Sequence, residues 1–272
     1  MVGRTRGPTE DGRAQVRWLG AAGFELCLEQ LDACIDPFQV PGRGRALFAD
    51  LSRRKPDVVF VTHGHLDHAR DVPALVRGGG TAVYASIRVC ELLHDLGTPA
   101  RQLHPLAGGR TVSFGKVSVL AVPARHALFD PCLVLRTLLR VGRQTIRVLR
   151  AFGAYPCGDV LGYRFQGPGG TFVHFGTAGW YRAEMTRLRA DVALLPMQGH
   201  TRIYDRVTCA AEWLAPRRVI IHHHDDCCPP LTEAIDTAPF VELMRRQLPD
   251  VDVVVPVLGE WFPLFPGRCS AA

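Results

Sequence analysis

An apolar strand that runs directly into a cluster of histidines is the feature that most constrains this chain. Residues 58–61 are wholly apolar β-forming residues, a pattern typical of a strand buried on both faces. The run Thr62-His63-Gly64-His65-Leu66-Asp67-His68 follows at once. In an extended loop, His63 and His65 project to the same side and can reach one ion. Asp67 and His68 come as the chain turns toward a helix, and can serve a second ion a few ångströms away.

These ligand types restrict the choice of metal. Imidazole and carboxylate together suit zinc, manganese or iron rather than calcium. A lone histidine is more often a satisfied polar group than a ligand, but four ligand-type residues packed this tightly after a buried strand favour metal binding. The expected cofactor is zinc, as one or two ions, with manganese and iron as the alternatives.

The rest of the chain alternates short β-like runs with helical stretches. Strands are predicted at residues 15–19, 24–28, 33–35, 58–61, 82–84, 117–122, 162–165, 171–174, 192–195, 219–221 and 253–257, and helices at 86–96, 181–188, 206–214 and 238–247. This interleaving predicts an α/β architecture in one domain spanning residues 1–272. No apolar stretch approaches the length of a membrane span and the start lacks a signal-peptide pattern, so we expect a cytoplasmic protein.

A helical insertion at about residues 127–157 interrupts this rhythm. Five of its arginines are spaced by four, three, four and three residues and form one predicted stripe along a helix: Arg136, Arg140, Arg143, Arg147 and Arg150. The leucines and the isoleucine of this segment lie largely off the stripe. One interpretation is a surface helix with a solvated charged face. The other is a lid beside the active site that meets an anionic substrate or a lipid surface. Gly142 would weaken or kink the helix, so two shorter helices fit equally well.

The run Thr62 to His68 resembles the H-x-H-x-D-H signature of the metallo-β-lactamase superfamily. The resemblance extends from Val16 through Phe262, and implies a four-layer αββα sandwich with the metals between the two sheets. Residues 17–24 and 35–38 are similar to the opening strands of one branch, which contains the ascorbate-phosphate lactonases and the N-acylphosphatidylethanolamine-type phospholipases D.

The resemblance implies further metal ligands. His126 takes the place of the third histidine of the first metal, and His223 that of the last ligand, although His222 and His224 beside it make the register ambiguous. The family's metal-bridging aspartate is replaced by Thr177, a neutral hydroxyl that is a poor ligand between two dications. The second metal is therefore expected to bind more weakly or to draw an unusual ligand: Asp225, Asp226 or Cys227.

The implied function is a zinc-type, phosphodiesterase-like metallo-hydrolase. A metal held by His63, His65 and His126 lowers the pKa of its bound water from 15.7 to about 7, giving hydroxide to attack an ester, phosphodiester or lactone. Asp67 serves as a second-site ligand or, if that site is empty, as a proton shuttle. His200 is a candidate for substrate contact or proton transfer, with a structural loop histidine as the alternative.

Charge and composition leave competing readings open. The formal net charge of +6 and the phosphodiester-suited metals admit a superfamily nuclease, but no aromatic residues interleave with a basic patch, so no nucleic-acid partner is expected. A catalytically degenerate metal-binding protein is the second alternative, because the bridging aspartate is lost. The expected partner is a small-molecule or lipid-like anionic substrate, with peripheral membrane contact as an open possibility; the sequence does not indicate an oligomeric state.

Overall fold

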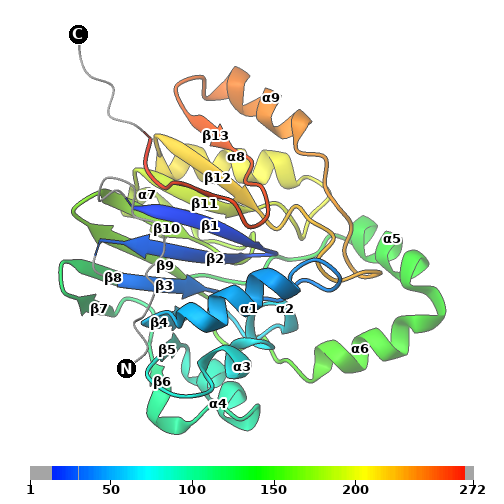
Figure 1. Ribbon diagram of the computed structural model, residues 1–272. Helices are drawn as coiled ribbons and strands as arrows, with labels where there is room; N and C mark the ends of the chain where they lie inside the picture. The colour runs from blue at the N-terminus through cyan, green and yellow to red at the C-terminus, as the bar shows by residue number, and fades with distance from the viewer. Residues whose placement is uncertain (1–13, 30, 267–272) are drawn as a thin grey trace.

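The protein is built on two seven-stranded sheets that pack face to face (Figure 1). The computed structural model describes residues 14–29 and 31–266, with the side chains of residues 147–149 and 152 also outside the description. Among these residues no helix is long and apolar enough to cross a membrane.

The first sheet has the strand order β14-β1-β2-β3-β4-β5-β6. Its strands are β1 (Gln15–Gly20), β2 (Gly23–Leu28), β3 (Leu31–Ile35), β4 (Val58–Phe60), β5 (Ala82–Ala85), β6 (Leu103–Pro105) and β14 (Trp261–Pro263). The hairpin of β1 and β2 turns through Gly20 and Ala21, both at positive φ, as the glycine-rich turn predicts. Strands β3 to β6 run parallel, so their carboxyl ends lie at one edge of the sheet.

The second sheet has the order β13-β12-β11-β10-β9-β8-β7. Its strands are β7 (Thr111–Phe114), β8 (Val117–Pro123), β9 (Leu161–Gly167), β10 (Gly170–His174), β11 (Val192–Pro196), β12 (Arg218–His222) and β13 (Asp252–Val254). Strands β10 to β13 are parallel. The strand predicted at 253–257 is shorter than expected, because β13 ends at Val254 and the two valines beyond it, Val255 and Val257, are exposed.

Helices cover the outer face of each sheet. The first sheet carries α1 (Arg45–Arg54), α2 (Leu66–Ala69), α3 (Val72–Val76), α4 (Ile87–Asp95) and the 3₁₀ turn η1 (Ala100–Gln102), and the second carries α7 (Arg182–Leu188), α8 (Ile203–Leu214) and α9 (Ala238–Gln247). One apolar cluster fills the space between the sheets, and two others join each sheet to its helices. The predicted αββα sandwich is confirmed.

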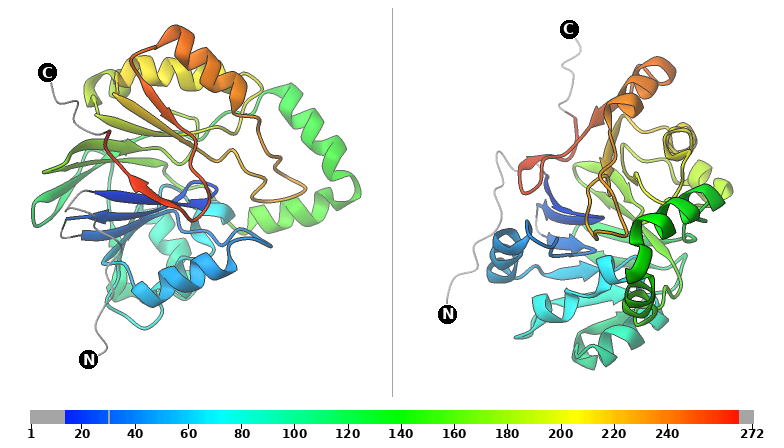
Figure 2. Two further views of the ribbon diagram at one scale, coloured as in Figure 1. Left: turned by 45° about the horizontal axis from the view of Figure 1, so that its top comes forward. Right: turned by 90° about the vertical axis from the view of Figure 1, so that its right-hand side faces the viewer.

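The insertion at 127–157 forms a helical hairpin, consisting of α5 (Pro131–Val141), the 3₁₀ turn η2 (Gly142–Gln144) and α6 (Thr145–Gly153), that projects beyond the end of the sheets (Figures 1 and 2). Two helices form rather than one because Gly142 adopts φ +52°, outside the helical region. The side chain of Asp130 caps α5 by accepting a hydrogen bond from Leu133 N at 3.0 Å.

In the described part of α5 the arginine stripe is partly solvated and partly paired, since the side chain of Arg136 is 61% exposed and that of Arg140 is 26% exposed. Arg140 and Arg136 both pair with Glu233, and Arg140 also donates to the carbonyls of Pro230 and Leu231 at 2.8 Å each. Apolar side chains of α5 are exposed as well, with Leu135 and Leu139 60% and 76% exposed. The stripe prediction at Arg147 falls outside the described side chains.

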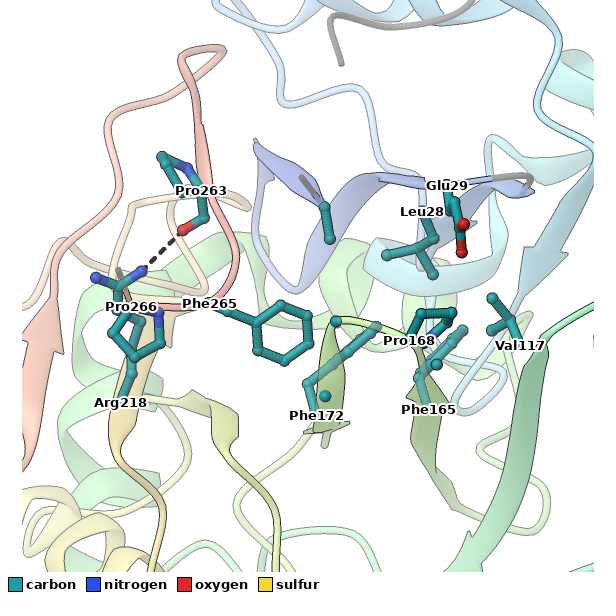
Figure 3. Close-up of a pocket in the computed structure, with 14 residues that line it drawn as sticks. Leu28, Glu29, Val117, Phe165, Pro168, Phe172, Arg218, Pro263, Phe265 and Pro266 are labelled. Carbon is teal, nitrogen blue, oxygen red and sulfur yellow. Dashed lines mark hydrogen bonds between the residues drawn. The ribbon is translucent and has the colours of Figure 1, made fainter. Parts of the chain in front are cut away.

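A cavity of about 710 Å³ lies at the end of the sandwich opposite the histidine-rich motif. It surrounds the start of β10 and the end of β2, whereas the motif follows the end of β4 (Figure 3). Apolar side chains such as Phe165, Phe172 and Phe265 dominate its wall, and Arg218 is held there by a hydrogen bond to the Pro263 carbonyl at 2.8 Å.

Candidate metal centre

Four loops bring the candidate ligands together at one end of the sandwich. They follow the ends of β4, β8, β10 and β12, and carry the motif at 63–68, His126, Thr177 and His223 respectively. Close backbone packing fixes two of these loops against each other, since a Cβ on Gly179 would lie 2.0 Å from the Arg125 carbonyl oxygen. The structure thus assembles one site from residues more than 150 positions apart.

His63, His65 and His126 form the first cluster. Their candidate ligand atoms all lie within 4.8 Å of one another, close to the largest separation, about 4.2 Å, of two nitrogens that bind one ion at about 2.1 Å. His126 Nδ1 pairs with the Ala127 carbonyl at 2.9 Å, which leaves its Nε2 as the candidate ligand atom. The donor set therefore fits a divalent metal with an open coordination position.

The protonation of this cluster also suits a metal. Burial lowers the pKa of His63 well below its usual value and that of His65 to about 4, with neighbouring imidazoles adding to the effect. Burial lowers the pKa of His126 as well. All three rings are therefore neutral near pH 7, and each has a lone pair to give to a metal.

Asp67, His223 and Cys227 form a second cluster, in which one ligand atom of each lies within 4.8 Å of the others. His223 Nε2 lies 3.1 Å from Asp67 Oδ2, and His68 Nε2 lies 3.5 Å from the same oxygen. Although burial opposes it, the charges of His68 and His223 hold the pKa of Asp67 well below its usual range. Asp67 is therefore an anion at neutral pH, as a metal ligand must be.

The buried carboxylate of Asp36, at the end of β3, positions both clusters. Its Oδ1 accepts from Thr62 N at 2.7 Å, and its Oδ2 accepts from Thr62 Oγ1 at 2.6 Å and from His68 Nδ1 at 2.7 Å. Thr62 Oγ1 also lies 3.0 Å from His63 Nδ1. We call these contacts the Asp36 network.

The Asp36 network fixes the rings of His68 and His63 through the nitrogens that face away from the ligand clusters, an arrangement common around metal-binding histidines. The sequence analysis assigned Asp36 no role in the site. The only available signal was an aspartate directly after a predicted strand and before Pro37, where a carboxylate reaches the same sheet edge as the motif.

Three adjacent histidines separate cleanly in the structure. His222 is the last residue of β12 and points between the sheets, where its ring stacks on that of His174 with centroids 4.9 Å apart. His224 stacks on Trp18 at 4.5 Å. His223, at φ +56°, is the one of the three that reaches Asp67, because the chain leaves the strand there and the side-chain alternation breaks.

Thr177 lies at the site and is nearly buried, at 8% exposure. Its hydroxyl accepts a hydrogen bond from Ala127 N at 3.1 Å, so it ties the β10 loop to the loop that carries His126. The structure thus gives this hydroxyl a local structural partner.

His174 and Tyr204 do not join the site. His174 Nε2 pairs with the Ala22 carbonyl at 3.0 Å inside the sandwich, and the Tyr204 hydroxyl donates to the Asp236 carbonyl at 2.5 Å. His200 does face the site: it lines the same pocket as the histidines, and its Nδ1 accepts from Arg202 N at 2.9 Å.

The two clusters open into a pocket of about 480 Å³. Its outer wall comes from α5 and the 228–235 loop, and is largely apolar: Phe129, Leu133, Val134, Leu138, Leu231 and Ile235. Asp130 joins α5 to the opposite rim by accepting hydrogen bonds from Thr201 N and Oγ1 at 2.8 and 3.0 Å. Helix α5 of the hairpin thus forms part of the wall of the pocket, and contact with an anionic substrate or a lipid surface stays a prediction.

Comparison with known proteins gives a consistent answer. A family model described as the beta-lactamase superfamily domain matches residues 31–224. A UPF0173 metal-dependent hydrolase of Pyrobaculum neutrophilum is 25% identical over 213 residues, which are 76% of this chain and 82% of the relative.

Solved structures share the fold. Igni18, a metallo hydrolase from Ignicoccus hospitalis, is 22% identical with a TM-score of 0.69, covering 92% of this chain and 97% of its own. CmlA, a diiron β-hydroxylase from Streptomyces venezuelae, has a TM-score of 0.63 at 14% identity, over 95% of this chain and 55% of its own. The matched family model, the related metal-dependent hydrolases and the shared sandwich agree with the histidine motif, and the chain therefore belongs to the metallo-β-lactamase superfamily.

Proposed function

We propose that this protein is a metal-dependent hydrolase that cleaves an ester or lactone bond in a substrate with an apolar body. The observation that carries the proposal is the convergence of His63, His65 and His126 on the floor of a pocket with an apolar wall. The relatives named as metal-dependent hydrolases support the reaction class.

The chain's own residues divide the work of such a reaction. A divalent ion at the three histidines supplies an activated water and a Lewis acid. Asp67, anionic and 3.1 Å from His223, holds a second ion or accepts a proton when that position is empty. His200, on the pocket rim with its Nδ1 already hydrogen-bonded, has Nε2 available for a substrate oxygen or a departing group.

The lining of the pocket favours an apolar substrate group over a phosphate group. Arg136 and Arg140 line the pocket, but the Glu233 carboxylate pairs with both and offsets part of their positive charge. Leu138 and Ile235 offer apolar surface where an acyl or aryl group would lie. Phosphodiesters, including the nucleic acids of the nuclease alternative, therefore rank below esters and lactones, although the metal centre suits both chemistries.

A substrate screen tests this proposal directly. The protein, reconstituted separately with zinc, manganese and iron, is assayed against p-nitrophenyl acyl esters of increasing chain length, lactones and bis-p-nitrophenyl phosphate. We expect kcat/KM to rise with acyl length and Leu138→Asn to remove that rise. Leu139→Asn is the matched control, because Leu139 is 76% exposed and is not among the pocket residues. A preference for the phosphodiester would refute the substrate class.

The degenerate alternative predicts a different outcome. If the loss of the bridging aspartate had ended catalysis, no metal would restore turnover to the wild-type protein, and Thr177→Asp would create activity. An active hydrolase instead shows turnover in the unmodified protein. We expect zinc to be the most effective of the three metals, and His126→Ala to abolish both metal binding at the first cluster and turnover.

A further inference from the structure

The second cluster is short of one anionic ligand. Members of the superfamily that this chain resembles place a carboxylate between the two metals, but here Thr177 stands at that position and its hydroxyl serves the Ala127 amide. Asp67 is then the one carboxylate among the described members of this cluster, alongside the imidazole of His223 and the thiol of Cys227. A single negative charge leaves a bound dication only half neutralised.

Three residues near His223 could supply the missing charge, and the structure separates them. The carboxylate of Asp225 accepts two hydrogen bonds from Ala21 N, at 3.1 and 3.3 Å, and is thereby turned toward the β1–β2 turn. Asp226 Oδ1 accepts from Thr232 Oγ1 at 2.7 Å. Cys227 alone of the three belongs to the cluster with Asp67 and His223.

The Cys227 thiol is fully buried and faces the candidate ligands. Its Sγ lies 3.9 Å from His223 Nδ1, and it falls within 4.8 Å of a ligand atom of both Asp67 and His223. The competing interpretation is a packing role, because Cys227 also contacts an apolar group formed with Ala21, Phe38 and Val40. Packing alone, however, does not require a sulfur atom at this spacing from two ligand-type side chains.

The surrounding loop holds Cys227 in place. Cys228 N donates to Thr232 Oγ1 at 2.7 Å, and Leu231 N donates to the Cys228 carbonyl at 2.8 Å. Arg140 holds the next residues from outside through the Pro230 and Leu231 carbonyls. A ligand supported in this way is already positioned for a metal before the metal arrives.

We propose that Cys227 binds the second metal ion as a thiolate, together with Asp67 and His223. The sulfur–metal bond forms as the thiol proton leaves to solvent, so that the thiolate and the Asp67 carboxylate together neutralise a divalent ion. His68 Nε2 lies 3.5 Å from Asp67 Oδ2 and supports this carboxylate, while the Asp36 network occupies its Nδ1. The thiolate also makes the second site selective for zinc and cobalt over manganese, since soft sulfur ligands disfavour hard cations.

The proposal rests on the proposed metal centre, but its test is the identity of the ligands rather than turnover. Zinc X-ray absorption is measured on the wild-type protein carrying one and then two equivalents of zinc. We expect a sulfur neighbour at about 2.3 Å to appear with the second equivalent. With cobalt in place of zinc, the second equivalent should bring a near-ultraviolet thiolate-to-cobalt charge-transfer band.

Matched variants assign the sulfur. Cys227→Ser should lose the sulfur neighbour and the charge-transfer band while keeping one tightly bound equivalent, whereas Cys228→Ser should keep both signals. The proposal would be overturned if the wild-type protein bound two equivalents of zinc without a sulfur neighbour, or bound only one equivalent. Either result would leave the three-histidine site intact. A sulfur signal that persists in Cys227→Ser would also overturn it. If the protein binds no metal at all, the proposed function fails together with this inference.

Discussion

Replacing Asp36 with asparagine tests how far the metal centre depends on a residue that is not itself a candidate ligand. The asparagine keeps the shape of the side chain and can still accept from Thr62 N through Oδ1. Its amide group, however, takes the place of Oδ2 and brings N–H donors against His68 Nδ1, which now lies 2.7 Å from that oxygen. The Thr62 hydroxyl can adapt, because His63 Nδ1 is within 3.0 Å.

The magnitude follows from one lost charged hydrogen bond. Such bonds contribute about 1.5 to 3 kcal/mol each, so the free energy of unfolding of the metal-free protein should fall by about 2 to 3 kcal/mol. Loss of a partner that orients a metal-binding histidine typically costs 10- to 100-fold in metal affinity, or about 1.4 to 2.8 kcal/mol. The two estimates agree in size because both describe the loss of the same hydrogen bond, the one between His68 Nδ1 and Asp36 Oδ2.

The assay combines urea unfolding of the metal-free protein with chelator competition for zinc. Asp191→Asn is a matched control: Asp191 accepts hydrogen bonds from N and Oγ1 of a single threonine, Thr171, at 2.7 and 2.8 Å, at the opposite end of β10 from the site. We expect Asp191→Asn to lower stability without changing zinc affinity. The reasoning would be refuted if Asp36→Asn bound zinc as tightly as the wild type. It would also be refuted if Asp36→Asn and Asp191→Asn lost the same amount of zinc affinity.

Three further outcomes can be measured. Burial lowers the pKa of His65 and of His174 to about 4, so the metal-free folded protein binds fewer protons than the unfolded chain, whose histidines titrate near 6.5. The free energy of unfolding in urea should therefore be highest above about pH 6.5 and fall toward pH 4, by up to about 1.4 kcal/mol per pH unit for the fully buried His174; stability that rises on acidification contradicts this. Arg140→Leu removes the bonds that Arg140 makes from α5 to Pro230, Leu231 and Glu233, and should speed limited proteolysis within residues 131–153 several-fold, whereas Arg143→Leu, at an exposed position, should not. Gly176→Ala would set a Cβ 2.2 Å from the Thr62 hydroxyl, and should lower the free energy of unfolding by about 1 to 3 kcal/mol; an unchanged thermal midpoint would show that the loop can move away.

Much of the sandwich could be predicted because its strands are locally distinct. Strands β4 and β11 are apolar throughout and each directly follows an aspartate, so their pattern alone identifies them. Strands β6 and β7 escaped prediction because they lie at sheet edges, where they are largely exposed and carry little hydrophobic signal. Helix α1 was missed for a similar reason, since Leu51 is its one buried residue.

Long-range contacts explain what the sequence could not predict about the site. The role of Asp36 could not be predicted, because only the pairing of β3 with β4 places its carboxylate beside Thr62 and His68. The pairing of the arginine stripe with Glu233 could not be predicted, because Glu233 lies 93 residues beyond Arg140 in the chain. The branch of the superfamily and the cytoplasmic location stay predictions.

Under the proposed function, helix α5 lies where it would contact the substrate but not the bond that is cleaved. Helix α5 belongs to a contiguous segment that begins after His126 and ends where the Cys157 carbonyl accepts from Gly64 N at 2.8 Å, and it shares the outer wall of the pocket with the 228–235 loop. The histidines, by contrast, are fixed by strand ends and by the Asp36 network. We therefore expect changes in the length or sequence of this segment to alter the substrate range while the histidine cluster stays unchanged.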